Sequence, residues 1–136
     1  MPPSTGTGSR IRKLSGVDNQ RLQVICLCAA WCGVCRDWRG AFEQAASEHP
    51  QADFAWVDIE DEAEAMDDYD VETFPTLLVA QGGRARFLGP VQPSAAQVAR
   101  LLASLGEGAR PAEPQQADAL LSRLAGNAVA RGRLTR

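Results

Sequence analysis

The sequence has little of what marks membrane, nucleic-acid-binding or secreted proteins. Its longest apolar run, residues 24–34, is about half as long as the roughly 20 residues of a transmembrane helix. Lys and Arg number 14 against 17 Asp and Glu, and no basic stripe is present, so nucleic acid is not expected as a partner. The first ten residues contain no apolar stretch of the kind found in secretory signals. We therefore expect a soluble, cytoplasmic protein without a membrane partner.

Length and composition indicate one ordinary globular domain. The chain has 136 residues, of which 45% are hydrophobic and 23% charged. A domain of this size can bury a core without disulfide staples. Residues 1–10, which are rich in Pro, Ser, Thr and Gly, are predicted to be a disordered lead. We expect the domain at 11–105 and a C-terminal extension at 106–136.

Hydrophobic patterning predicts an α/β protein. Residues 22–28 are almost continuously apolar, which is typical of a strand buried on both faces of a sheet. The other expected strands are 11–14 at an edge, 54–59, 76–80 and 84–88, and the expected helices are 33–47, 61–69, 94–105 and 115–125. This order predicts a central sheet with helices on both sides. The end of the chain, residues 131–136, is expected to be frayed.

The four cysteines are concentrated in one short segment: Cys26, Cys28, Cys32 and Cys35. Disulfides that staple a fold usually join distant segments, so this cluster indicates redox chemistry or a metal site. Cys32 and Cys35 lie at the start of a predicted helix, where their spacing brings the sulfurs within disulfide reach. The helix N-terminus favours the thiolate form of Cys32. Cys35, one turn deeper, can then attack a mixed disulfide on Cys32.

The other two cysteines allow a second interpretation. Cys26 and Cys28 are two apart on a predicted strand, so their side chains share one face. If this face lies under the following helix, four sulfurs could approach one another and bind zinc or an iron–sulfur cluster. Tetrahedral geometry would require the strand end to bend, and free cysteine is usually a small buried hydrophobe. We therefore favour packing roles for both.

Two further motifs extend the pattern. Trp31-Cys32-Gly33-Val34-Cys35 follows the buried strand, and Thr73-Phe74-Pro75-Thr76 leads into the strand expected at 76–80. With the glycine turn at 81–83 and Gly89, these motifs resemble the thioredoxin family over about residues 15–105. The resemblance implies a thioredoxin-like fold with a central mixed sheet. It also implies a thiol–disulfide oxidoreductase that reduces protein disulfides and needs no cofactor or metal.

The resemblance assigns roles to single residues. Cys32 would be the attacking thiolate and Cys35 the resolving thiol. Pro75 would be cis and lie against the disulfide. The backbone of Phe74 would pair with an extended substrate segment, as in strand addition, and Trp31 would belong to the rim on which partners dock. The remaining substrate-binding positions are Gly33, Val34 and Gly89. The implied partners are disulfide-containing proteins and, as electron donor, a thioredoxin-reductase-like protein.

The sequence departs from the family pattern at several places. Val34 replaces the usual proline between the cysteines, and Gly40 replaces the helix-kinking proline. Cys26 replaces a buried aspartate, and Trp56 stands where that aspartate has a lysine partner. Because a buried thiol cannot accept a proton near neutral pH, Cys26 is predicted to modulate the rate of the resolving step.

Alternatives and charged residues complete the prediction. The alternative functions are a zinc or iron–sulfur site with four cysteine ligands and a non-catalytic thioredoxin-like binding module. The intact Cys32–Cys35 pair argues against the second. The acidic segment 58–70 is interpreted as a solvated face, with attraction of basic partners as the functional alternative. His49, the single histidine, is distant in sequence from the cysteines, so no Cys–His pair is expected.

Overall fold

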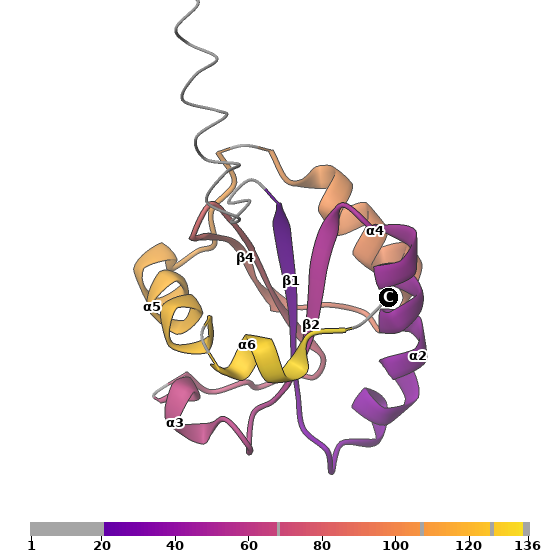
Figure 1. The fold of residues 1–136 in the computed structure, drawn as a ribbon, viewed down its shortest axis with the longest axis horizontal. Coiled ribbons are helices and arrows are strands. Elements are labelled where there is room, and N and C mark those ends of the chain that lie inside the picture. The colour runs from indigo at the N-terminus through magenta and orange to yellow at the C-terminus, as the bar shows by residue number, and fades with distance from the viewer. Residues whose placement is uncertain (1–20, 68, 107, 126, 135–136) are drawn as a thin grey trace, which may run out of the picture.

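The computed structural model describes residues 21–67, 69–106, 108–125 and 127–134 (Figure 1). The predicted disordered lead, the edge strand at 11–14 and residues 135–136 lie outside the described residues. The elements are β1 (Leu22–Cys28), α2 (Gly33–Glu48), β2 (Ala52–Asp58), α3 (Ala63–Met66), β3 (Thr76–Gln81), β4 (Arg84–Pro90), α4 (Ala95–Ser104), α5 (Pro114–Leu124) and α6 (Asn127–Gly132).

The strands form one mixed sheet in the order β2-β1-β3-β4. β1 pairs in parallel with β2, and α2 provides the crossover that a parallel pair requires. The pairs β1–β3 and β3–β4 are antiparallel, and Gly82 and Gly83 both have the positive φ that a tight hairpin turn needs. The predicted mixed sheet flanked by helices is confirmed.

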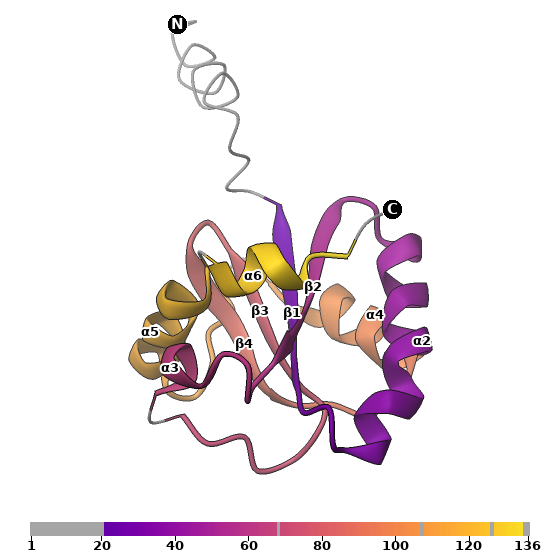
Figure 2. The ribbon, with the colours of Figure 1, turned by 60° about the horizontal axis from the view of Figure 1, so that its bottom comes forward.

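Side-chain alternation along β1 divides the core into two halves. Val24, Cys26 and Cys28 belong to the cluster that contains the buried residues of α2 and α4. Ile25 and Leu27 belong to the opposite cluster, with buried residues of α5 and α6. Figure 2 shows α2 and α4 on one side of the sheet and α3, α5 and α6 on the other. Cys26 and Cys28 therefore face α2.

Several elements differ from the prediction at their ends. The helix predicted at 61–69 is only the short α3, because Asp67, with φ 51°, leaves the right-handed helical region.

Ser94 is the N-cap of α4, as predicted, and its hydroxyl accepts a hydrogen bond from the Gln97 N–H at 3.4 Å. Within the described ranges, no helix has both the length and the apolar character needed to cross a membrane.

The C-terminal extension packs on the domain, and the predicted fraying is wrong up to residue 134. α6 forms over part of this segment, and Leu134 N–H donates to the Phe54 carbonyl at 2.9 Å. Arg133 forms a bridge with Ala55, so the segment attaches to the outer edge of β2. Gly132 is required there, since a Cβ atom would overlap the Trp56 carbonyl. An edge strand offers unpaired backbone groups, and these hold the tail.

The opposite edge of the sheet is bound by side chains of the extension. Ala85, on β4, donates its N–H to Asp118 at 2.8 Å, and its carbonyl accepts from Arg110 at 2.8 Å. Arg110 and Asp118 also form an ion pair at 2.7 Å. The buried leucines of α5 lie in the same half of the core as the β1 residues that face away from α2. The extension thus completes the core on this side.

We predict that Leu120→Ala lowers the free energy of unfolding by about 2–5 kcal/mol, because Leu120 is completely buried. Ser122→Ala, on the exposed side of the same helix, is the matched control and should change this free energy by less than about 0.5 kcal/mol. Urea denaturation measures both. A Leu120→Ala variant as stable as the control would show that α5 does not contribute to the core.

Candidate active site

The four cysteines lie where the end of β1 meets the start of α2. Cys26 and Cys28 belong to β1, Cys32 is the N-cap of α2, and Cys35 lies in its first turn. Cys26, Cys28 and Cys35 are almost completely buried, with exposed fractions of 0%, 0% and 1%. Cys32 is partly exposed and has a free thiol. One cysteine of the cluster therefore contacts solvent while three belong to the core.

The disulfide in this structure joins Cys28 to Cys35, with 5.9 Å between their Cα atoms. It is not the Cys32–Cys35 disulfide implied by the sequence, and the packing role assigned to Cys28 is incomplete. The physical reason is the shared face of β1, which places Cys28 directly under α2. The two-residue spacing of Cys26 and Cys28 already indicated that both side chains lie on this one face of β1. Cys26 remains free, and its sulfur lies 3.5 Å from that of Cys28.

Burial raises the pKa of the Cys26 thiol, because desolvation disfavours its charged form. Cys26 is thus protonated at neutral pH. It pairs in register with Trp56 of β2, and the Arg39 guanidinium lies 4.7 Å from the centre of the Trp56 ring. A cation is therefore present on this side of the site. Sequence reasoning missed Arg39, although its position one turn after Cys35 places both on one side of α2.

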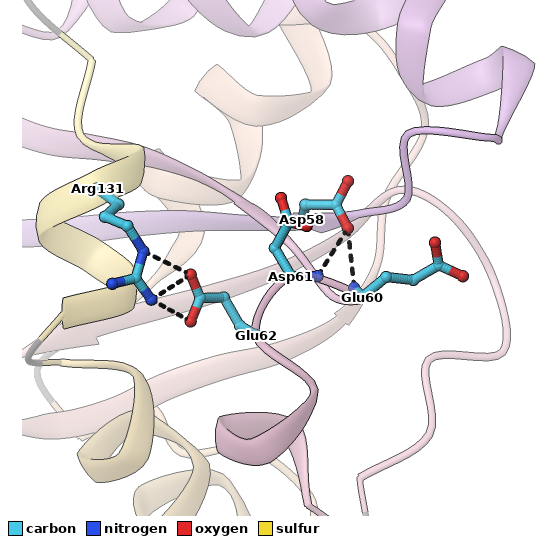
Figure 3. Close-up of polar contacts among 5 residues, drawn as sticks. All are labelled: Asp58, Glu60, Asp61, Glu62 and Arg131. Carbon is cyan, nitrogen blue, oxygen red and sulfur yellow. Dashed lines mark hydrogen bonds and ion pairs between the residues drawn. The ribbon is translucent and has the colours of Figure 1, made fainter.

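A cavity of about 740 Å³ adjoins the site, and Cys35 is among its lining residues together with Arg36, Arg39, Trp56, Asp58 and Arg131. Arg131 of α6 donates to Glu62 across this region, with Nε 2.9 Å from Oε2 (Figure 3). The cavity is thus bounded by α2, the end of β2 and the C-terminal extension. It brings charged groups of both signs close to the buried Cys35.

Asp58 holds the loop before Cys32 in place. Its carboxylate accepts a hydrogen bond from the Ala30 N–H at 3.1 Å. On the other side it accepts from the N–H groups of Glu60 and Asp61, at 2.8 and 3.3 Å (Figure 3). From the sequence, residues 58–70 were predicted to be a solvated face, with attraction of basic partners as the functional alternative. Asp58 is instead a structural part of the site, and its position at the end of β2 is the signal that could have indicated this.

An apolar rim surrounds Cys32. Trp31 and Val34 have exposed fractions of 61% and 46% and are the exposed large hydrophobic residues of the described chain. The Trp31 ring meets Phe74 edge-on, with 5.5 Å between ring centres, and its Nε1 donates to Glu60 at 2.9 Å. These contacts hold the indole in one orientation. The structure therefore brings together Trp31 and Phe74, which are distant in sequence.

The remaining predicted site residues lie on different elements. Gly33, the first residue of α2, is exposed beside Cys32. Pro75 is buried, and the Phe74–Pro75 peptide bond is cis. Gly89 lies on β4 opposite Leu77, and β3 separates it from the cysteines of β1.

Metal binding finds no support in this geometry. Among the described residues, no group of three or more His, Cys, Asp and Glu side chains is arranged to hold a metal ion. With Cys28 and Cys35 joined, only Cys26 and Cys32 have free thiols. His49 caps the far end of α2, where Nδ1 lies 2.9 Å from the Ala45 carbonyl. The fold and the cysteine cluster are those of a redox-active α/β domain.

Comparison with known proteins defines the family. A family model described as Thioredoxin matches residues 13–101. A thioredoxin H-type of Picea mariana is 30% identical over 78 residues, which are 57% of this chain and 62% of that protein. Thioredoxin-1 of Saccharomyces cerevisiae is 30% identical over 70 residues, 52% of this chain and 68% of that protein. The chain belongs to the thioredoxin family.

Solved structures agree with this result. The thioredoxin of Fasciola hepatica superposes with a TM-score of 0.58 and 27% identity, covering 73% of this chain and 94% of that one. The predicted thioredoxin-like fold is confirmed. The match spans about two thirds of the length of the two curated relatives named above. These relatives support the class of thiol–disulfide oxidoreductase.

Proposed function

We propose that the protein is a thiol–disulfide oxidoreductase that uses Cys32 and Cys35 to reduce disulfides of protein substrates. The observation that carries this proposal is the free, partly exposed thiol of Cys32 at the N-cap of α2, next to the buried Cys35. A thiol must be exposed to reach a protein disulfide, and its resolving partner must be close but protected. Membership of the thioredoxin family supports the same chemistry.

The reaction has two exchange steps. The Cys32 thiolate attacks one sulfur of the substrate disulfide, and the other substrate sulfur leaves with the electron pair and takes up a proton. Cys35 then attacks the Cys32 sulfur, which releases the second substrate thiol. The substrate gains two electrons and the protein becomes oxidised. The N-terminus of α2 favours negative charge at Cys32 and so supports the first step.

Substrates would dock on the rim formed by Trp31, Val34 and Phe74. Large exposed apolar side chains are costly unless a partner covers them, and Trp31 is already oriented by Phe74 and Glu60. Gly33 leaves space beside Cys32, and Pro75 and Gly89 are the remaining proposed substrate-binding positions. The carboxylates after β2 would favour basic segments near the substrate disulfide.

The proposed partners follow from the chemistry. They are disulfide-containing proteins as substrates and a thioredoxin-reductase-like protein as the donor that restores the dithiol. A reductant that works through free thiols needs a reducing compartment, which supports a cytoplasmic location.

Trapping tests the roles of the two cysteines. We predict that Cys35→Ser accumulates a mixed disulfide with insulin, because the resolving sulfur is missing. Cys32→Ser should accumulate at least about tenfold less, since its remaining thiols are buried. Non-reducing electrophoresis followed by mass spectrometry measures both. Equal amounts of trapped insulin would overturn the assignment of Cys32 as the attacking thiol.

The pH dependence tests the role of Cys26. Cys35 needs a base, and the raised pKa of Cys26 prevents this thiol from accepting a proton at neutral pH. The decay of the mixed disulfide should therefore accelerate as pH rises from about 7 to 9, because solvent hydroxide increasingly takes the proton that Cys26 cannot accept. Cys26→Asp should accelerate the decay near pH 7 by at least about tenfold, because it introduces a carboxylate base.

Cys26→Asn, which has similar shape but no base, is the matched control and should not accelerate the decay. Stopped-flow fluorescence measures the rates, and urea denaturation measures the accompanying loss of stability from a buried carboxylate. Arg39, over the Trp56 ring, places a compensating cation on this side. A flat pH profile without acceleration in Cys26→Asp would contradict the prediction and point to Asp58, which lines the same cavity as Cys35.

A further inference from the structure

Cys28 has no role in the reaction proposed above, yet the structure joins it to Cys35. Their Cα atoms are 5.9 Å apart, a separation that ordinary disulfides have. Cys28 ends β1 and faces α2, and both sulfurs lie in one half of the core. The exposed fractions of 0% and 1% show that this disulfide is almost completely buried, although Cys35 lines the cavity described above.

Cys35 therefore has two disulfide partners within reach. Cys28 approaches it from β1, as the structure shows. Cys32 precedes it by one turn of α2, and side chains at this spacing are neighbours on a helix. A sulfur forms one disulfide at a time, so each pairing leaves the other partner as a free thiol. In this structure the free partner is Cys32.

We propose that Cys28 is a third redox-active cysteine. After a substrate has been reduced, Cys28 replaces Cys32 as the disulfide partner of Cys35. The oxidised protein then carries the buried Cys28–Cys35 disulfide and a free Cys32 thiol at its surface. This inference rests on the proposed function, because substrate reduction is what produces the Cys32–Cys35 disulfide on which Cys28 acts.

The step is an internal exchange. Cys28, as thiolate, attacks the Cys35 sulfur; the Cys28–Cys35 bond forms and the Cys32–Cys35 bond breaks. Cys32 leaves with the electron pair as a thiolate, and the proton given up by Cys28 balances the one that Cys32 can take up. No electron enters or leaves the protein. Cys32 is the N-cap of α2 and is partly exposed, so solvent and the helix N-terminus can accommodate the leaving thiolate.

The surroundings of Cys28 support its role as nucleophile. The Cys26 thiol donates toward the Cys28 sulfur over 3.5 Å, and a hydrogen bond to a charged group favours the charged form. In the structure Cys26 stays a free thiol while Cys28 is the strand cysteine bonded to Cys35. The buried Cys28–Cys35 disulfide would then be both formed and reduced through the Cys32 thiol.

Differential alkylation of the full chain locates the disulfide. The reduced protein is oxidised with one molar equivalent of diamide, which leaves no thiol adduct, and is quenched in acid. Free thiols are alkylated under denaturing conditions with light N-ethylmaleimide, and the reduced disulfide then receives the heavy reagent. Trypsin cuts after Arg21 and Arg36, so one peptide, residues 22–36, carries all four cysteines. Its fragment spectrum assigns the two labels.

We expect the heavy label on Cys28 and Cys35. Cys26→Ala is the matched control for removal of a buried thiol: it should slow the exchange, because the hydrogen bond to Cys28 is lost, but should leave the heavy label on Cys28 and Cys35 at equilibrium. In Cys28→Ala the heavy label should move to Cys32 and Cys35. Heavy label on Cys32 and Cys35 in the unaltered protein would overturn the proposal, and this measurement depends on no variant folding.

Reduction by glutathione tests whether the Cys28–Cys35 disulfide is reached through Cys32. Because Cys32 is the partly exposed thiol beside the buried disulfide, oxidised Cys32→Ser should be reduced by glutathione at least about tenfold more slowly than the unaltered protein. Equal rates would contradict the exchange. Insulin reduction is measured separately. Loss of insulin reduction with the label on Cys28 and Cys35 would refute the proposed function alone, whereas active protein labelled on Cys32 and Cys35 would refute this inference alone.

Discussion

The register of β1 is the constraint on which the site depends. This strand lies between β2 and β3, and residues 24–28 are completely buried, so each of its side chains is committed to one half of the core. A shift of one residue would turn Cys26 and Cys28 away from α2 and bring Ile25 and Leu27 beneath it. The pairing of Cys28 with Cys35 thus depends on packing along the whole strand, rather than on the cysteines alone.

Sequence patterns predicted those features that arise from neighbours along the chain. The bounds of β1 agree with the prediction, because a short run of apolar residues is typical of a doubly covered strand. The end of the chain was predicted poorly, since its Arg, Gly and Thr residues are typical of solvent-exposed segments. The backbone of Arg133 and Leu134 is held by Ala55 and Phe54 of β2, and partners so distant in sequence leave no local pattern.

The same distinction applies to the site. The position of Cys32 and Cys35 at the start of α2 follows from their spacing on a helix. The contacts of Arg39 with Trp56 and of Asp58 with Ala30 join separate elements, so only the folded chain shows them. Cys28 is intermediate between these cases. Its face on the strand could be predicted, but the partner across the layer could not.

The C-terminal extension has a consequence for how this protein meets others. Residues 133–134 occupy backbone groups on the outer edge of β2, and Asp118 and Arg110 occupy those of Ala85 on β4. Exposed sheet edges are templates for β-sheet growth between molecules. Because both edges are engaged at these points by the chain itself, edge-to-edge pairing with the sheet of another molecule is disfavoured. The extension thus protects the sheet from strand addition by another molecule at these points.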